Sequence, residues 1–438
     1  MLSVASRPLP ESTDLRATPE DVLPGEAATL RAAQASLAGE SRGLRALWPF
    51  LGPAFIAAVA YVDPGNFATG AAAGSKFGYL LVWVVVSANL MAMLVQTLSA
   101  KLGVASGLNL AEACRETMPR ARYGLWVQAE LVAMATDIAE VVGAALGLNL
   151  LTGLPLFPAA LVTGGAAFAI LGLQRHGFRR LEAAIAALVG VIAISFALSV
   201  FVVEPDGREI VRHLVPAFQG TESLLLATGI LGATLMPHVI YLHSALTQHR
   251  IVGRDDRERR LIQRFERIDV MIAMSIAGLV NLSILAIFAA SLGGLGVDDI
   301  PVAHDLLKSQ EGAGVAFLFG LALLASGLSS SSVGTMAGQV VMQGFINRRI
   351  PLFLRRAITL TPALVVVGVG LDPSRALVIS QVVLSFGIPF ALVPLIWITS
   401  RRDIMGALAN TRVTTVIASA IATVIITLNV VLLVDLAF

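Results

Sequence analysis

Two long apolar stretches of this chain are each interrupted by a proline next to polar or sulfur-bearing side chains. The first interruption is Asp-Pro-Gly-Asn at residues 63–66, and the second, about half the chain later, is Met-Pro-His at residues 236–238. Backbone that crosses a bilayer must satisfy its own hydrogen bonds, so a broken helix is tolerated only where it is buried in protein or lines a watery cavity. Corresponding breaks in two halves of a chain indicate a transport site near the middle of the membrane.

The composition places the whole chain in a membrane. Hydrophobic residues make up 56% and charged residues 14% of the 438 residues, and the mean hydropathy is +0.81, which is outside the range of soluble globular domains. Since a bilayer core takes about 20 apolar residues per helix, we expect an all-α polytopic membrane protein with about eleven spans. The expected spans lie near residues 47–76, 79–104, 124–150, 157–174, 181–203, 222–248, 268–292, 313–340, 354–370, 375–398 and 413–437.

Positive charge is concentrated on alternate connections between these spans, and the opposite connections are short or acidic. By the positive-inside rule, the N-terminus is expected in the cytoplasm and, with an odd number of spans, the C-terminus outside a plasma (inner) membrane. The basic residues that carry this prediction are Arg42, Arg45, Lys101, Arg115, Arg120, Arg122, Arg175, Arg179, Arg180, Arg250, Arg254, Arg257, Arg259, Arg260, Arg264, Arg267, Arg348, Arg349, Arg401 and Arg402.

The breaks at the start of the first and sixth spans predict an inverted repeat of five plus five helices. Residues 46–203 would form the first half, residues 221–398 the second, and residues 411–438 an accessory eleventh helix. Residues 1–45 are rich in Pro, Ser, Ala and mixed charge and have no continuous apolar core, which predicts a disordered cytoplasmic tail rather than a signal peptide.

The first break has the chemistry of a cation site. Pro64 disfavours helical geometry at Asp63 and suits the first position of a new helix, which the Asp63 carboxylate can cap. A kink with a cap would explain Asp63 alone, but it does not need Asn66 on the same face. Carboxylate and amide oxygens, with free carbonyls such as that of Ala60 at the end of the preceding half-helix, together form a set of ligands for a cation.

The second break adds a soft ligand. Pro237 forces Met236 out of helical geometry and frees carbonyls in residues 232–235. Met236 on its own is more often a packing residue, but a thioether placed at a break opposite a carboxylate suits late first-row transition metals, whereas Mg²⁺ and Ca²⁺ prefer oxygen. His238 and His243 follow on the next half-helix and could be ligands, proton acceptors or neutral structural histidines.

The third span carries three acids in an otherwise apolar run, Glu130, Asp137 and Glu140. Their spacing places them along one helical face, and burying them in lipid would be costly, so they must face a wet or paired interior. Structural ion pairs with Arg355 or Arg356 of the ninth span are one explanation. The favoured alternative is a proton relay, a role that acid chains commonly have in transporters.

Four motifs now resemble a known family. The stretches DPGN at 63–66, GATLMPH at 232–238, DIAEVVG at 137–143 and GQVVMQGF at 338–345 are similar to the hallmark motifs of the Nramp family of proton-coupled divalent metal transporters, called the MntH type in bacteria. The resemblance runs in order from about Phe50 to the C-terminus. It implies a leucine-transporter-like fold of ten inverted-repeat helices and import of Mn²⁺ and Fe²⁺.

The resemblance also implies roles for single residues. The family's metal ligands fall on Asp63, Asn66, Met236 and the Ala233 carbonyl, joined in some states by the Ala60 carbonyl and by Gln381 as the site closes. Gly70 departs from the family pattern, in which asparagine is common. Proton handling in relatives is associated with the positions of Asp63, His238, Glu130, Asp137 and Glu140, with Arg355 and Arg356 as charge partners.

These observations predict a secondary transporter that imports Mn²⁺, Fe²⁺ and soft ions such as Cd²⁺ by alternating access, coupled to protons. The metals are substrates, and no permanently bound cofactor or obligate protein partner is expected. A net charge of +2 is too small to indicate nucleic-acid binding. A sodium-coupled amino-acid symporter of the same fold is the alternative. An enzyme or receptor is disfavoured, because Ser329–Ser332 suits small-residue helix packing better than a nucleophile, and the single Cys114 excludes an intramolecular disulfide.

Overall fold

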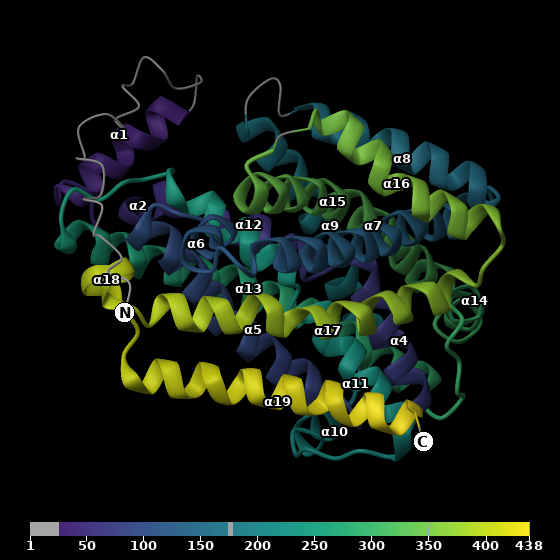
Figure 1. The fold of residues 1–438 in the computed structure, drawn as a ribbon. Helices are drawn as coiled ribbons and strands as arrows, with labels where there is room; N and C mark the ends of the chain where they lie inside the picture. Colours follow the sequence, from purple (N-terminus) through teal and green to yellow (C-terminus); the bar gives the residue numbers. More distant parts are fainter. Residues whose placement is uncertain (1–25, 174–177, 349, 438) are drawn as a thin grey trace. The chain divides into compact units, whose positions relative to one another are not determined.

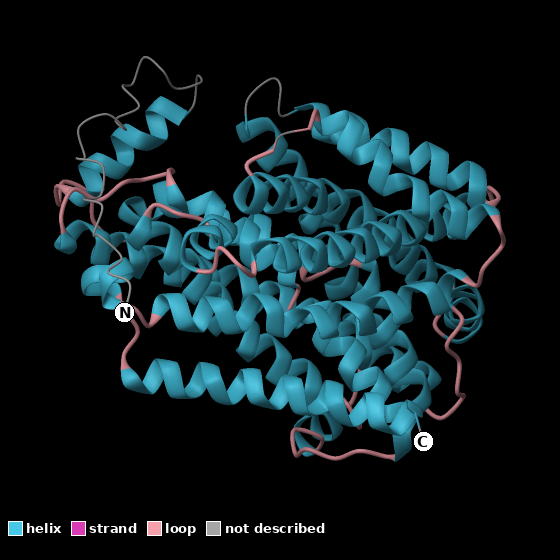
Figure 2. Ribbon diagram, viewed as in Figure 1, coloured by secondary structure: helices cyan, strands magenta, loops and turns pink. Residues whose placement is uncertain are grey.

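The computed structural model describes residues 26–173, 178–348 and 350–437, and these residues form helices joined by short connections without any strand (Figures 1 and 2). Arg175 and Arg349, which the topology prediction uses, lie outside the described residues, as do residues 1–25 of the predicted tail and Phe438. The side chain of Arg179 is likewise not described.

The first five predicted spans are all present as helices. The first is divided by the Asp63 break, and the other four are continuous. Their bounds are α3 (Pro53–Ala60) with α4 (Pro64–Phe77), α5 (Val82–Ser106), α7 (Arg122–Thr152), α8 (Leu156–Gly172) and α9 (Phe178–Val203), with the short α6 (Leu110–Thr117) and α10 (Gly207–Arg212) between and after them.

The remaining six spans follow the same pattern, with the break at Met236 in the first of them. They are α11 (Gly220–Thr234) with α12 (Pro237–Gln248), α13 (Asp256–Leu292), α15 (Ala313–Ile346), α16 (Leu352–Gly368), α17 (Pro373–Thr399) and α19 (Arg412–Ala437). The short α14 (Ile300–Gln310) and α18 (Arg402–Met405) lie in connections.

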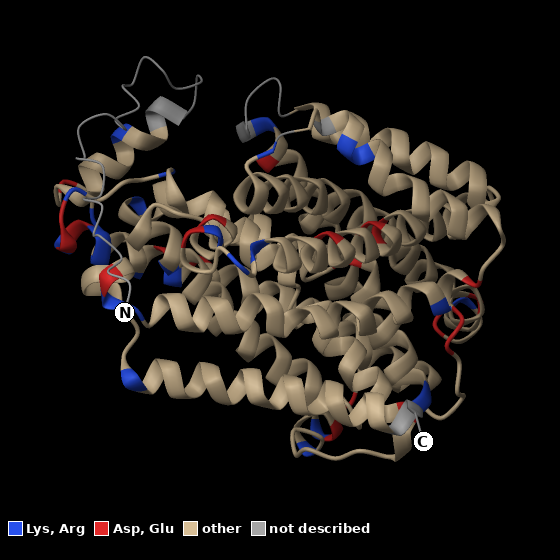
Figure 3. Cartoon of the chain, viewed as in Figure 1, with Lys and Arg blue, Asp and Glu red and all other residues tan. Residues whose placement is uncertain are grey.

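Helix length and composition support this number of spans. Within the described ranges, eight helices are long and apolar enough to cross a membrane when α11 and α12 are taken together. The interrupted pair α3 and α4, the 17-residue α8 and the 17-residue α16 bring the number to the predicted eleven. Figure 3 shows that α17 and α19 are almost free of charged residues along their lengths, as spans exposed to lipid must be.

The packing of these helices has the internal symmetry expected of an inverted repeat. α4 packs on α13 in the first half as α12 packs on α5 in the second, and α9 packs on α15 as α17 packs on α7. Exchanging the two halves converts the α4–α13 contact into the α12–α5 contact, and the α9–α15 contact into the α17–α7 contact. The two third helices, α7 and α15, share the most extensive contact, where Gly327 lies against Ala144 and leaves no room for a side chain. This contact confirms small-residue packing on the eighth span.

The prediction for the N-terminal tail is wrong over one stretch. Glu26–Leu37 forms α1, and Leu44–Leu47 forms α2 within the following segment. The α1 sequence contains no Pro or Gly and consists largely of Ala, Leu, Glu, Gln and Arg, which have high intrinsic helix propensity. The absence of an apolar core therefore did not imply the absence of local helix.

The basic connection between the sixth and seventh spans is partly helical. α13 begins at Asp256, about a dozen residues before its apolar part, and Asp255 caps it by accepting a hydrogen bond from the Glu258 amide at 2.8 Å. The arginines of this extension therefore lie on a helical turn continuous with a membrane span.

Candidate metal centre

The two breaks share one local cause. In an α-helix each carbonyl accepts from the amide four residues later, and proline has no amide hydrogen to donate. Pro64 stands four residues after Ala60, and Pro237 stands four residues after Ala233. Both alanines are fully buried. The sequence therefore leaves the carbonyl oxygen of one buried alanine at each break without its helical partner.

Asp63 is the N-cap of α4, as predicted, and only one of its two carboxylate oxygens takes part in the cap. Its backbone is extended (φ −85°, ψ 167°), and its Oδ1 accepts from the Asn66 amide at 2.9 Å and from Asn66 Nδ2 at 2.9 Å. The second oxygen, Oδ2, is buried and has no hydrogen-bond partner among the described residues. An unpartnered buried carboxylate oxygen is costly unless a ligand or proton takes it.

Asn66 joins the two breaks. Its Nδ2 donates to the Tyr61 carbonyl at 3.1 Å and lies 3.0 Å from the Ala233 carbonyl, while its Oδ1 accepts from Thr234 Oγ1 at 3.3 Å. The Ala233 carbonyl freed by Pro237 is therefore held by a side chain of the other break. A cation that displaced these amide contacts would find the amide oxygen, the carbonyl and the Asp63 carboxylate close together.

Two further side chains, which the sequence analysis missed, stabilise the first break. Asn281 Nδ2 of α13 donates to the Tyr61 carbonyl at 2.8 Å, and Ser326 Oγ of α15 donates to the Val62 carbonyl at 2.6 Å. Among the described residues no donor is recorded for the Ala60 carbonyl. The polar residues inside apolar spans were the available signal, but sequence alone does not reveal which carbonyl each one reaches.

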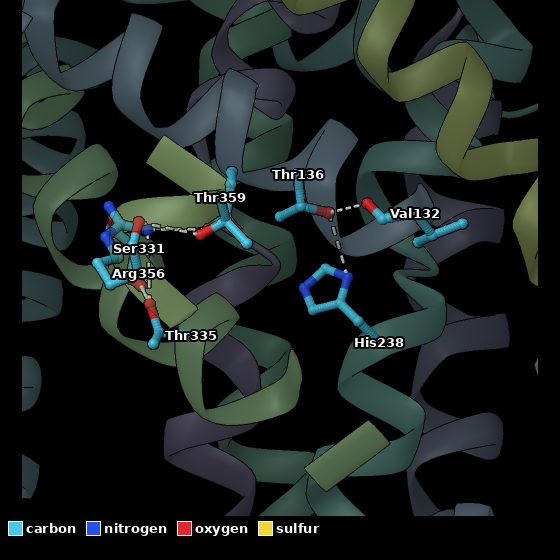
Figure 4. A network of polar contacts seen from close by, with 8 residues as sticks. Val132, Thr136, His238, Ser331, Thr335, Arg356 and Thr359 are labelled. Carbon is cyan, nitrogen blue, oxygen red and sulfur yellow. Dashed lines mark hydrogen bonds and ion pairs between the residues drawn. The ribbon is translucent and has the colours of Figure 1, made fainter. Parts of the chain in front are cut away.

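Met236 stands at the second break, outside helical geometry, as the following Pro237 predicts. It is fully buried and is the N-cap of α12, with an extended backbone (φ −61°, ψ 116°) followed by Pro237. His238 follows on α12; its Nδ1 lies 3.3 Å from Thr136 Oγ1 of α7, and its Nε2 has no partner within the described part of the chain (Figure 4). His243, one helical turn or more away, hydrogen-bonds Gln96 Oε1 at 2.8 Å instead.

Gln381 of α17 lies directly against the first break. A side chain at Gly65 would collide with the Gln381 side chain, and a side chain at Gly232 of α11 would collide with the Gln381 carbonyl. Gln381 Nε2 donates to Ser380 Oγ at 3.1 Å, and Oε1 is buried without a partner among the described residues. The glycines therefore let the Gln381 side chain approach the first break closely, which explains Gly65 at this position.

The donor set has an unusual composition for a metal centre. The described residues contain no group of three or more His, Cys, Asp or Glu side chains that could hold a metal ion. The available groups are instead one carboxylate, two amide oxygens, two freed carbonyls and one thioether. A single charge with five neutral donors, one of them soft, can hold a divalent transition metal without binding it irreversibly.

Gly70, the departure from the family pattern, lies on α4 beyond the site. A Cβ at this position would come within 2.9 Å of Ile284 Cγ2 on α13, so a larger side chain would require the neighbour to move. The close contact between α4 and α13 is therefore compatible with glycine at this position.

The three acids of α7 and the two arginines of α16 form what we call the acid–arginine column: Glu130, Asp137, Glu140, Arg355 and Arg356. Arg355 Nη2 lies 2.6 Å from Glu130 Oε2, and Arg356 Nη1 lies 2.8 Å from Asp137 Oδ1. Figure 4 shows Arg356 also reaching Ser331 and Thr335 of α15, with Thr335 Oγ1 at 3.4 Å. The structural ion pairs considered from the sequence are present for two of the three acids.

Glu140 differs from the other two acids. Both of its carboxylate oxygens are buried without a hydrogen-bond partner in the described residues, and the carboxylate faces Gly334, whose missing side chain makes room for it. The charges of Asp137, Arg356 and Asp63 all act on this carboxylate. Glu140 is therefore the acid of the column without an arginine partner among the described residues.

A third polar group, absent from the predictions, holds the start of α3. Asp269 Oδ2 of α13 accepts from the Gly52 and Ala54 amides at 3.2 and 2.9 Å, and Arg250 Nη2 donates to the Leu51 carbonyl at 3.1 Å. Arg250 also lies 3.4 Å from Glu182 of α9. The available signal was an acid next to basic residues at the start of the seventh span. From sequence, this stretch predicted only which side of the membrane the connection faces.

Eleven spans in two inverted halves, with buried polar groups where the first helix of each half is interrupted, define a membrane transporter. The family model described as natural resistance-associated macrophage protein-like (Nramp) matches residues 54–435. The chain belongs to the Nramp family, which confirms the resemblance drawn from its motifs.

Relatives cover nearly the whole chain. A divalent metal cation transporter MntH of Bacillus subtilis (strain 168) is 56% identical over 409 residues, which is 92% of this chain and 96% of the relative. The crystal structure of an Eremococcus coleocola manganese transporter, solved with an aromatic bis-isothiourea compound, is similar with a TM-score of 0.80 at 35% identity, covering 89% of this chain and 88% of the other.

A more distant structure bears on the fold alone. Mhp1, a nucleobase-cation-symport-1 family transporter in a closed conformation, has a TM-score of 0.57 at 16% identity and covers 88% of this chain and 90% of its own. This similarity confirms the predicted leucine-transporter-like fold and carries no information about the substrate.

Proposed function

We propose that the protein imports divalent transition metal ions, principally Mn²⁺ and Fe²⁺ and also soft ions such as Cd²⁺, by alternating access coupled to proton movement. It would act in the plasma membrane with its N-terminus in the cytoplasm and its C-terminus outside. Metal transport by the MntH relative and the manganese transporter named above supports the substrate class.

One observation carries the proposal. Prolines at corresponding positions of two broken helices free the Ala60 and Ala233 carbonyls, and Asn66 Nδ2 links the Ala233 carbonyl to Asp63, whose Oδ2 is buried without a partner among the described residues. Each group alone has an ordinary structural explanation. Together they form a buried set of electron-pair donors with one negative charge, which is suited to a divalent cation that loses most of its water.

The ligand set we propose is Asp63, Asn66, Met236 and the Ala233 carbonyl, completed by the Ala60 carbonyl and by Gln381 when the site is closed. Met236 contributes the selectivity, because its sulfur favours transition metals over Mg²⁺ and Ca²⁺. Gln381 would replace a water ligand of the ion as α17 approaches α4.

The proton would follow a separate path from the metal. Asp63 loses its proton when the metal binds, and Glu140 is the nearest unpaired acid of the column that could receive it. Asp137 and Glu130, held by Arg356 and Arg355, then continue the route along α7, and His238 with its free Nε2 lines the same side. In this arrangement metal and proton share only Asp63.

The start of α3 would form the cytoplasmic gate. Hydrogen bonds from Gly52 and Ala54 to Asp269, and from Arg250 to the Leu51 carbonyl, hold this half-helix against α13 and its neighbours. Release of these contacts would let α3 move and open a path from the ligands to the cytoplasm, whereas α4 could stay in place.

The test is metal uptake by the purified protein in liposomes with an acidic exterior. We expect uptake of Mn²⁺, competition by Fe²⁺ and Cd²⁺ at comparable concentrations, weak competition by Ca²⁺ and Mg²⁺ in large excess, and internal acidification in step with the metal. Protein-free liposomes are the control. Uptake of Mn²⁺ at the control rate, together with sodium-dependent leucine uptake, would overturn the proposal in favour of an amino-acid symporter.

A further inference from the structure

The span next to the site, α17, contains a proline that removes one of its own helical hydrogen bonds. Pro389 lies inside this helix four residues after Ser385, so the Ser385 carbonyl has lost its helical amide partner in the same way as Ala60 and Ala233. Ser385 is buried, and a buried carbonyl without a donor is costly. Something outside α17 must therefore satisfy it.

That partner comes from the last helix. Asn429 of α19 donates from Nδ2 to the Ser385 carbonyl at 2.9 Å and accepts from Ser385 Oγ at Oδ1 at 2.8 Å. The asparagine is 4% exposed although much of α19 faces outward. A two-way hydrogen bond between one side chain and one residue fixes both position and orientation, and Figure 1 shows α19 running beside α17.

Ser385 lies one helical turn after Gln381, and residues 381–387 touch both halves of the second broken helix. The Gln381 carbonyl lies against Gly232 of α11, and Gly387 lies against Pro237 of α12 and Val132 of α7, with no room for a side chain at either glycine. The Gln381 side chain itself contacts Gly65 of α4. A small change in the geometry of α17 between Gln381 and Pro389 would therefore move Gln381 relative to both breaks.

We propose that Asn429 is a positioning residue for transport: it satisfies the carbonyl that Pro389 frees, holds this part of α17 in its observed geometry and thereby places Gln381 against the first break. The inference rests on the proposed metal transport, but Asn429 is not itself one of the proposed metal ligands. It also changes the status of α19, which the sequence analysis treated as accessory to the repeat. The eleventh helix acts on the site through one side chain.

The first test compares binding with transport. Asn429→Ala should lower the maximal rate of Mn²⁺ uptake about tenfold, because an unsatisfied buried carbonyl disfavours the closed form, while Mn²⁺ affinity of the detergent-solubilised protein stays within about twofold, since Asp63, Asn66 and Met236 are untouched. Thr423→Ala, at an exposed position of the same helix, is the matched control and should transport like the wild type. Wild-type transport by Asn429→Ala, or an equal loss of affinity and rate, would overturn the proposal.

A double-variant cycle separates this role from general packing. Pro389→Ala restores an amide that can bond the Ser385 carbonyl within the helix, so Asn429→Ala should cost much less in the Pro389→Ala background than in the wild type. An undiminished defect in that background would show that Asn429 acts through something other than the freed carbonyl, and the proposal would fail.

A third measurement does not depend on metal transport. Hydrogen–deuterium exchange of peptides covering residues 381–390 should be faster in Asn429→Ala than in the wild type and in Thr423→Ala, and Pro389→Ala should restore slow exchange to the variant. If wild-type protein fails to transport Mn²⁺ but shows this exchange pattern, the proposed function fails while the role of Asn429 in holding α17 stands. Unchanged exchange would overturn that role directly.

Discussion

The two broken helices and the acid–arginine column are both polar regions inside an apolar bundle, and they differ in how far their polar groups are satisfied. In the column, Glu130 and Asp137 each have an arginine at hydrogen-bonding distance, so their charges largely cancel. At the breaks, Asp63 Oδ2 and Gln381 Oε1 are buried without hydrogen-bond partners among the described residues. A buried polar group without a hydrogen-bond partner can bind a ligand reversibly, whereas a group already paired within the protein stabilises the packing of its helices.

Glu140 shows where the two regions meet. It is a member of the column by sequence, three residues after Asp137, but by its unpaired oxygens it resembles the breaks. Because the charges of Asp63 and Asp137 both act on it, a change of charge at the metal site alters the free energy of its ionised form. In the proposed transport cycle, this residue would couple metal binding at Asp63 to proton movement along the column.

The largest effect is expected from Asp63→Asn, which removes the only formal charge at the breaks. Mn²⁺ affinity and uptake should fall by two orders of magnitude or more, since losing one partner of a buried charge pair costs about 2–5 kcal/mol. Calorimetric titration and liposome uptake measure the two quantities. Asp305→Asn, at an exposed carboxylate of α14, is the control, and wild-type-like uptake by Asp63→Asn would remove this residue from the ligand set.

Asp137→Asn makes the equivalent change in the column and should have a different result. Arg356 is left as a buried charge without its partner, so the free energy of unfolding should fall by about 3 kcal/mol, while Mn²⁺ affinity is retained and metal-driven acidification is lost. Asp137→Asn combined with Arg356→Gln removes both charges and should recover stability but not proton movement. A loss of affinity as large as that of Asp63→Asn would instead assign both acids to one metal site.

Gly65→Ala tests whether closing the site depends on the approach of Gln381. The added methyl group collides with the Gln381 side chain, and such overpacking costs about 1–3 kcal/mol, which corresponds to a roughly 5- to 150-fold loss of maximal uptake rate. Gly165→Ala on α8 adds the same methyl group where nothing lies within 4 Å and should be neutral. Gly65→Ala combined with Gln381→Ala should regain part of the rate; no recovery would show that Gln381 is not the obstructing group.

The smallest effect on Mn²⁺ is expected from Met236→Ala, since the oxygen ligands remain. Loss of the thioether should weaken Mn²⁺ binding by about 1 kcal/mol, so uptake of Mn²⁺ should fall roughly fivefold. Uptake of Cd²⁺ should fall further. Ca²⁺ and Mg²⁺ should begin to compete, because all the remaining ligands are oxygens. Parallel uptake assays with each ion in wild type and variant measure this. If Ca²⁺ and Mg²⁺ remain excluded, selectivity comes from cavity size or rigidity, and Met236 is a packing residue.

Much of the fold followed from the sequence, because a membrane span must be apolar over a fixed length and must close its own hydrogen bonds. The eleven apolar runs and the two proline breaks were visible in this way. The helix of residues 26–37 was not, since it depends on local propensity rather than on the apolar pattern of a membrane span. Asp269 was missed for a related reason: its role is to accept the Gly52 and Ala54 amides, more than 200 residues away in sequence.

The sequence by itself determined which backbone groups would be left open. A proline removes one amide hydrogen, so Pro64, Pro237 and Pro389 mark Ala60, Ala233 and Ser385 as carbonyls without helical partners. Only the tertiary structure decided which of them would be satisfied by a neighbour. Asn429 reaches Ser385, and Asn66 links Ala233 to the other break, whereas Asp63 Oδ2 keeps an unused lone pair. Those outcomes depend on how helices distant in sequence pack together, and no local pattern of residues contains that information.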